Sequence, residues 1–240
     1  MTSISISKEG EVFPGFLYGE HNPNKFGVVV IQEIWGVTDP IKYRAKELSE
    51  ALQCKSIVPD LYRGKIARKI DEATHFRQHL DWKGAFQDVE AAAKSLRNQY
   101  GCSKVGVVGF CMGGALALAA SVLCSGLDAT VCFYGVPSED LCDLTKIKIP
   151  VQCHFGDKDH AKGFSDPETA RSLKEKLEKH NIIHEFYTYP NAGHAFMNPP
   201  EEWDPEMREM LKDRLAGQYD EESRKVALNR MLAFFKKYLS

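Results

Sequence analysis

Residues 105–114 constrain the fold of this chain more than any other part of its sequence. They read Val-Gly-Val-Val-Gly-Phe-Cys-Met-Gly-Gly, and a run of small helix-forming residues follows at once. A β-branched strand that ends in Gly-x-Cys-x-Gly and passes directly into a helix predicts a sharp, strained turn. Gly109 and Gly113 leave room for that turn, which would expose the Cys111 side chain above the sheet. The amino end of the helix would favour a thiolate, so we expect Cys111 to be a nucleophile rather than an inert buried cysteine.

Two further reactive groups follow Cys111 along the chain. The run from Pro150 predicts a strand that ends in the loop Gly-Asp-Lys-Asp, residues 156–159. Residues 184–189 alternate like a strand, and His194 follows them. Open α/β sheets bind their ligands beyond the carboxyl ends of their strands, where these loops would meet. Nucleophile, acid and histidine in this order match the arrangement of α/β-hydrolases, but the chemistry leaves both Asp157 and Asp159 open as the acid.

Strands alternate with helices over the rest of the chain, which predicts a mostly parallel, doubly wound α/β sheet flanked by helices. Residues 3–7 and 12–17 alternate like an edge hairpin, and the apolar run 28–31 is typical of a strand buried on both faces. With the turn at Cys111, this pattern predicts an α/β-hydrolase fold in a single domain, residues 1–240. Further strands are expected at 56–58 and 130–134, and helices at 40–52, 82–96, 167–180 and 221–239.

Composition excludes several functional classes. The net charge is −2 with no long basic or acidic run, so we expect no nucleic-acid partner. No stretch approaches the ~20 apolar residues of a membrane span, and the first residues lack the apolar core of a signal peptide. Seven cysteines without a Cys-x-x-Cys pair indicate reduced thiols and a cytoplasmic location. His75 and His79 share helical spacing without further ligands, so we expect no metal and no cofactor.

Several short motifs, taken together, resemble the dienelactone hydrolase (carboxymethylenebutenolidase) family. They are Gln-Glu-Ile-Trp-Gly at 32–36, Pro-Asp-Leu-Tyr at 59–62, the turn at 106–114, Phe-Tyr-Gly at 133–135, Gly-x-x-Asp at 156–159 and Gly-His-Ala-Phe at 193–196. The resemblance implies a cysteine-dependent hydrolase of small esters or lactones that forms a thioester. It makes Cys111 the nucleophile and His194 the base. It also favours Asp159 over Asp157 as the acid, because Asp159 stands three residues after the glycine.

Glu33 is an unusual residue to find directly after an apolar strand. We expect its carboxyl group to be partly buried near the nucleophile, with a raised pKa. The resemblance implies that this glutamate holds the resting thiol and helps to deprotonate it when substrate arrives; the alternative is a capping role in a neighbouring loop. The backbone N–H groups of Ile34 and Met112 would form the oxyanion hole.

The predicted substrate site is less closely defined. In the resembling family an arginine shortly after the catalytic histidine binds a substrate carboxylate, and Asn198 stands at that position here. We therefore expect neutral esters to be used at least as well as anionic lactones. Either of the polar stretches 63–81 and 199–218 could border the cleft. Candidates for a second anion contact are Arg63, Arg68 and Arg77, and candidates for the pocket wall are Trp35, Tyr62, Tyr134, Phe196 and Asn198.

Two other classes of function remain open at this level. A reactive Cys111 would also suit a redox-responsive thiol protein, although no resolving cysteine is evident from the spacing. A non-catalytic binding protein could retain the fold, but it would have no need of a nucleophile, a histidine and an acid together. Turnover of an ester distinguishes these classes. The partner expected here is a small-molecule ester or lactone, and the sequence indicates no oligomeric state.

Overall fold

A computed structural model describes the backbone of residues 1–240 and every side chain except that of Leu215. Eight strands form one sheet in the order β1-β2-β4-β3-β5-β6-β7-β8. The hairpin of β1 and β2 at one edge of the sheet pairs antiparallel as predicted, β2 pairs antiparallel with β4, and the remaining neighbours are parallel. The strands are β1 (Thr2–Lys8), β2 (Glu11–Tyr18), β3 (Phe26–Ile31), β4 (Lys55–Pro59), β5 (Lys104–Phe110), β6 (Ala129–Phe133), β7 (Val151–Gly156) and β8 (His184–Tyr189).

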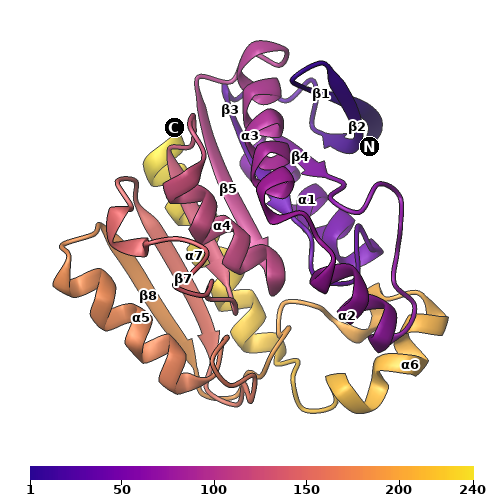
Figure 1. Cartoon of the computed structure of the whole chain (residues 1–240), viewed down its shortest axis with the longest axis vertical. Helices are drawn as coiled ribbons and strands as arrows, with labels where there is room; N and C mark the ends of the chain where they lie inside the picture. Colours follow the sequence, from indigo (N-terminus) through magenta and orange to yellow (C-terminus); the bar gives the residue numbers. More distant parts are fainter.

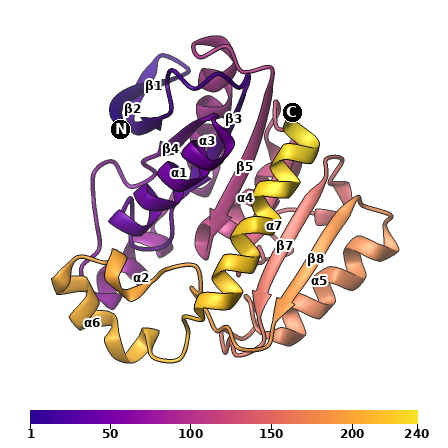
Figure 2. The ribbon, with the colours of Figure 1, turned by 180° about the vertical axis from the view of Figure 1, so that it is seen from behind.

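Helices cover both faces of this sheet, as the views from the front and from behind show (Figures 1 and 2). One face carries α3 (Trp82–Asn98), α4 (Met112–Leu123) and α5 (Pro167–Lys179). The opposite face carries α1 (Asp39–Leu52) and α7 (Glu221–Leu239). The central strands are therefore buried on both sides, and every residue of β3 and β6 is buried. The predicted mostly parallel sheet flanked by helices is confirmed.

Two segments that the sequence left without an assigned structure lie side by side at the carboxyl end of the sheet (Figures 1 and 2). Residues 63–81 contain α2 (Ile70–Gln78), and residues 199–218 contain the short 3₁₀ helix η2 (Pro200–Glu202) and α6 (Pro205–Leu215). A second 3₁₀ helix, η1 (Leu144–Lys146), precedes β7. A small apolar cluster joins α2 and α6 to the loop after β3, and its buried members are Trp35, Ala67, Ala73, Trp203, Met207 and Leu211.

The turn between β5 and α4 has the strained geometry that its glycines predict. Cys111 has φ 56° and ψ −120°, a conformation that non-glycine residues rarely adopt. A side-chain carbon on Gly109 would overlap the carbonyl oxygen of Gly113. One on Gly113 would lie 2.5 Å from the carbonyl oxygens of Ile31 and Gln32. Glycine is therefore required at both positions, because the backbone passes too close to leave room for a side chain.

Tyr134 departs from the strand that the sequence predicts over residues 130–134. The strand β6 ends at Phe133, and Tyr134 has φ 38°. Its fully buried ring lies against Phe196 and His194, with ring centroids 5.4 Å and 5.1 Å away. Tyr134 thus begins the loop after β6 and packs beneath the histidine loop.

None of the helices in the described chain is both long enough and apolar enough to cross a membrane.

Candidate active site

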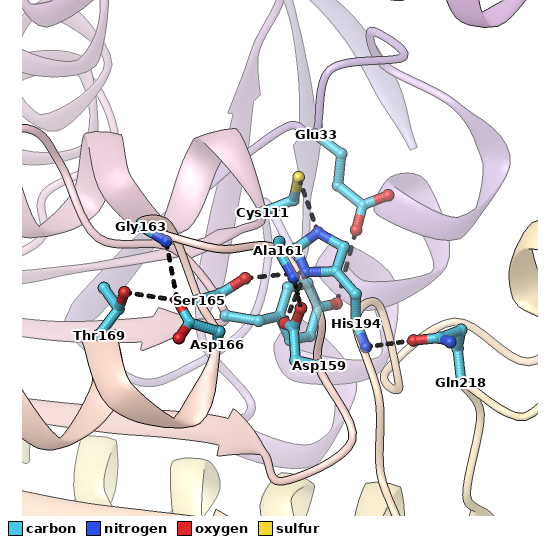
Figure 3. Close-up of polar contacts among 11 residues, drawn as sticks. Glu33, Cys111, Asp159, Ala161, Gly163, Ser165, Asp166, Thr169, His194 and Gln218 are labelled. Atoms are coloured by element: carbon cyan, nitrogen blue, oxygen red, sulfur yellow. Dashed lines mark hydrogen bonds and ion pairs between the residues drawn. The ribbon is translucent and has the colours of Figure 1, made fainter.

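Three loops at the carboxyl end of the sheet bring Cys111, Asp159 and His194 together (Figure 3). The Cys111 sulfur lies 3.2 Å from Nε2 of His194. On the other side of the imidazole ring, Nδ1 lies 2.7 Å from Oδ2 of Asp159. Cys111 comes from the turn after β5, Asp159 from the loop after β7 and His194 from the loop after β8. The contacts form a continuous nucleophile–base–acid chain of the kind that activates a nucleophile.

The geometry also distinguishes the two aspartates of this loop. Asp159 is 1% exposed and points toward His194, and its Oδ1 accepts a hydrogen bond from the backbone N–H of Ala161 at 2.9 Å. Asp157 is exposed. Burial alone would raise the pKa of Asp159, but its contact with His194 outweighs burial and holds that pKa below its usual value. Asp159 is therefore the carboxylate placed to orient the histidine.

The pKa of His194 is shifted well above its ordinary value. Burial alone would lower its pKa, but the negative charge on Cys111 and the hydrogen bond with Asp159 raise the pKa of the imidazole from 6.5 to about 10. A protonated ring between two anionic groups is stabilised by both. The arrangement thus favours an imidazolium ring, which can stabilise a negative charge on the neighbouring sulfur and can donate a proton.

Two residues that the sequence analysis did not single out also hold His194 (Figure 3). The buried hydroxyl of Ser165 lies 3.1 Å from Nδ1 of His194. The side-chain oxygen of Gln218 accepts a hydrogen bond from the backbone N–H of His194 at 2.6 Å. The backbone oxygen of Gln218 accepts another from Gly193 at 2.9 Å. No local motif marks either residue, because long-range packing alone brings them to the histidine.

Glu33 lies beside this group, as Figure 3 shows, and is 1% exposed. Both of its carboxylate oxygens lie 3.0 Å from Nδ2 of Asn198, and one lies 3.5 Å from the hydroxyl of Tyr134. Burial raises the pKa of Glu33, although the hydrogen bond from Asn198 and the nearby charge of His194 oppose that rise. Among the described residues Glu33 makes no hydrogen bond to Cys111, whose sulfur is directed to His194.

The two predicted oxyanion donors belong to residues that border the same cavity. Ile34 lies in the loop after β3, and Met112 is the first residue of α4. Within the part of the chain that the structure describes, neither backbone N–H has a hydrogen-bond partner. Unpaired amides beside a nucleophile can stabilise an oxygen anion, since their hydrogen-bonding capacity is unused before substrate binds.

The cavity beside Cys111 has a volume of about 630 Å³. Of the five side chains predicted to bind substrate, the structure places Trp35 in its wall. Tyr62, Tyr134, Phe196 and Asn198 are buried and lie outside the wall formed by the described side chains. Aromatic residues at strand ends pack inward here, because the sheet is covered on both faces. The apolar wall includes Ile34, Trp35, Trp82, Phe164, Trp203 and Leu211.

Both polar segments flagged by the sequence border this cavity. Arg77 from the first segment and Arg214 and Gln218 from the second line it. The other two arginine candidates are engaged elsewhere: Arg63 pairs with Asp88 at 2.7 Å, and Arg68 contacts acidic residues at the start of α6. Lys162 adds a third cation to the lining. Arg77, Arg214 and Lys162 are all exposed to solvent.

His75 and His79 share a helix face as their spacing predicts, with ring centroids 4.1 Å apart. Across the described residues no group of three or more His, Cys, Asp or Glu side chains is arranged to hold a metal ion.

Comparisons with known proteins agree with this fold. A family model described as "Dienelactone hydrolase family" matches residues 13–239. The chain is 33% identical over 207 residues to carboxymethylenebutenolidase of Pseudomonas putida, covering 80% of this chain and 84% of that protein. It is 31% identical over 224 residues to Protein usf of Aquifex pyrophilus, covering 89% of each. A crystal structure described as a putative dienelactone hydrolase from Klebsiella pneumoniae superposes with a TM-score of 0.78 at 25% identity, covering 99% of this chain and 98% of that one. The predicted α/β-hydrolase fold is confirmed.

The contact between Asp159 and His194 predicts a measurable change in the histidine. Replacing Asp159 by Asn removes a negative charge 2.7 Å from Nδ1, which disfavours the imidazolium form. The pKa of His194, about 10 in the intact site, should fall by about one to three pH units, as followed by NMR of the imidazole protons. Asp157→Asn is the matched control and should leave this pKa unchanged. An equal fall in both variants would contradict the assignment of Asp159.

Proposed function

Because the chain belongs to the dienelactone hydrolase family, we propose that it hydrolyses small esters or lactones through a thioester formed on Cys111. The observation that carries this proposal is the chain of contacts from the Cys111 sulfur to His194 and on to Asp159, at 3.2 Å and 2.7 Å. A binding protein without catalysis has no need of this alignment. The adjoining cavity, with its apolar wall, suits a small organic ester.

In the first step the Cys111 sulfur attacks the carbonyl carbon of the substrate. The carbon–oxygen π electrons move to the carbonyl oxygen, which becomes an anion. The backbone N–H groups of Ile34 and Met112 donate to this oxygen. Each such donor is worth about 2.7–4 kcal/mol to the transition state, by analogy with the loss of one donor in a serine protease.

In the second step the tetrahedral intermediate collapses to a thioester. The bond between the carbonyl carbon and the leaving oxygen breaks, and that oxygen takes the proton from Nε2 of His194. His194, now neutral, then removes a proton from water, which attacks the thioester carbonyl. The carbon–sulfur bond breaks, and the thiolate–imidazolium pair is restored. For a lactone the leaving oxygen stays tethered, so the product is an open-chain acid.

Glu33 is proposed to control the protonation of Cys111. Its carboxyl group is buried beside the Cys111–His194 pair, and burial makes it a stronger proton acceptor than an ordinary glutamate. Before the first step, when substrate arrives, this carboxylate takes the proton of the resting Cys111 thiol, and it returns that proton to the sulfur after the thioester is hydrolysed. An oxidation-prone thiolate would then be present only when it is needed.

The charge of the preferred substrate follows from the partners of the nearby polar groups. The amide of Asn198, at the position where the family carries an arginine, is occupied by Glu33. The cations that line the cavity are exposed, so solvent and salt screen them. We propose that neutral esters are therefore used at least as well as anionic ones.

The nucleophile is tested by hydrolysis of p-nitrophenyl acetate. Wild type should release p-nitrophenol catalytically, and Cys111→Ala should abolish turnover because no other group is placed to form the thioester. Cys124→Ala, which removes a half-buried cysteine remote from the triad, is the matched control and should retain turnover.

In the same assay, Asp159→Asn should lower kcat by up to ~10⁴-fold, as for the equivalent change in a serine triad. Undiminished hydrolysis by Cys111→Ala would exclude the assignment, and an inactive wild type would favour the redox or binding alternatives.

Substrate charge is tested with a pair of p-nitrophenyl esters that differ in one carboxylate, the butyrate and the hemisuccinate. The kcat/KM of the neutral butyrate should equal or exceed that of the anionic ester. Arg77→Gln and the control Arg68→Gln, whose side chain is paired with acids on α6, should both change this ratio by less than about threefold. A strong preference for the anionic ester that is lost in Arg77→Gln alone would contradict the proposal.

A further inference from the structure

The contact between the amide of Asn198 and the carboxylate of Glu33 gives Asn198 a role that the proposed reaction does not yet include. Nδ2 of Asn198 lies 3.0 Å from each carboxylate oxygen, and both residues are 1% exposed. The amide oxygen of Asn198 has no hydrogen-bond partner among the described residues. Leaving a buried oxygen unpaired is costly, so the contact with Glu33 decides how the amide is oriented. We propose that Asn198 is a positioning residue that keeps Glu33 ionised beside the Cys111–His194 pair, ready to accept a proton.

One short turn carries both His194 and Asn198. The backbone N–H of Asn198 donates to the carbonyl of Ala195 at 3.0 Å, and Ala195 has φ 60°. Phe196 and Met197, which lie between His194 and Asn198 in the sequence, are fully buried. The turn therefore fixes the distance between the base that faces Cys111 and the amide that faces Glu33. Asn198 cannot move far from Glu33 without disturbing the buried side chains next to it.

Helix α1 contacts this turn through the side chain of Arg44, which is 3% exposed. Its Nη1 donates to the carbonyl of Met197 at 3.2 Å. The same guanidinium pairs with Glu47 at 3.2 Å and with Glu202, and Arg224 of α7 also contacts both acids. Arg44 therefore forms ion pairs with two carboxylates other than that of Glu33. The direct donor to Glu33 is the neutral amide rather than this cation.

The titratable and charged groups that act on Glu33 are His194 after β8, Tyr134 after β6 and Arg44 on α1. Cys111, at the turn after β5, borders the same cavity as Glu33. Burial favours the neutral acid, whereas two N–H contacts from Asn198 favour the carboxylate. An apolar residue at position 198 would favour the protonated form of Glu33, which cannot accept a proton. A cation in direct contact would make Glu33 a poor acceptor. The amide leaves it both ionised and basic, as the proposed function of Glu33 requires.

The first test measures the titration of Glu33 itself and needs no enzymatic turnover. The ¹³C resonance of the Glu33 carboxyl group is followed against pH in glutamate-labelled protein and assigned by its loss in Glu33→Gln. In Asn198→Ala the pKa of Glu33 should rise by about one pH unit, since the donors to its charged form are removed. In Asn198→Asp, which keeps the size of the side chain, a second acid should raise it further. Having both variants keeps the test open if one of them folds poorly.

Asn22→Ala is the matched control for removal of an amide. Asn22 is half-buried at the far end of the sheet, where its Nδ2 donates to the carbonyl oxygens of Ser49 and Cys54 at 3.0 Å. This variant should leave the titration of Glu33 unchanged. An unchanged or lowered pKa of Glu33 in Asn198→Ala would overturn the proposal, since a protonated Glu33 would instead donate to the amide.

The second test follows hydrolysis in the same variants. The acidic limb of kcat/KM against pH should move upward in Asn198→Ala by as much as the pKa of Glu33 does. In the Glu33→Gln background the same substitution should cause no movement, because no carboxyl group remains to titrate. A movement of equal size in both backgrounds would show a general structural effect and overturn the proposal. If the chain hydrolyses no ester, the proposed function fails, and the NMR titration still decides whether Asn198 holds Glu33 ionised.

Discussion

The strained turn at Cys111 is the constraint on which the rest of the site depends. It places the sulfur at the carboxyl edge of the sheet with φ 56°, and it exists because the backbone closes tightly around Gly109 and Gly113. The parallel strands then determine where the other groups can be, because each of their loops emerges at the same edge. Asp159 and His194 reach the sulfur from the loops after β7 and β8.

Charge within the site is distributed over two buried carboxylates that differ in their partners. Asp159 is paired with His194, which keeps it ionised and orients the ring. Glu33 is paired with the amide of Asn198, and burial keeps its affinity for a proton high. Two acids of similar intrinsic strength are thereby suited to different tasks, one to hold a histidine and the other to exchange a proton.

The sequence predicts the framework of this site well, because its signals are local. The turn at Cys111, the order of the three reactive groups and the covered parallel sheet each follow from patterns of a few residues. The chemistry of the loop alone left Asp157 and Asp159 open, and the Gly-x-x-Asp motif favoured Asp159; the fold separates them physically, because it buries Asp159 and leaves Asp157 exposed. The segment 199–218 was a candidate for the border of the cleft, but its individual wall residues Trp203 and Gln218 were missed, because only long-range packing brings them to the cavity. Asn198 was recognised as unusual, but its contact with Glu33 joins residues 165 positions apart.

The thioester on Cys111 is the central claim, and rapid-quench mass spectrometry tests it most directly. Protein mixed with excess p-nitrophenyl acetate is quenched in acid within milliseconds, digested and sequenced by tandem mass spectrometry. The account predicts one acetyl group on the peptide that contains Cys111, carried by the sulfur and removed by neutral hydroxylamine. It also predicts that this group persists longer in His194→Ala, where the base that activates water is missing. Ester hydrolysis with no acyl group on Cys111 at any time, or with the label on another residue, would contradict the account.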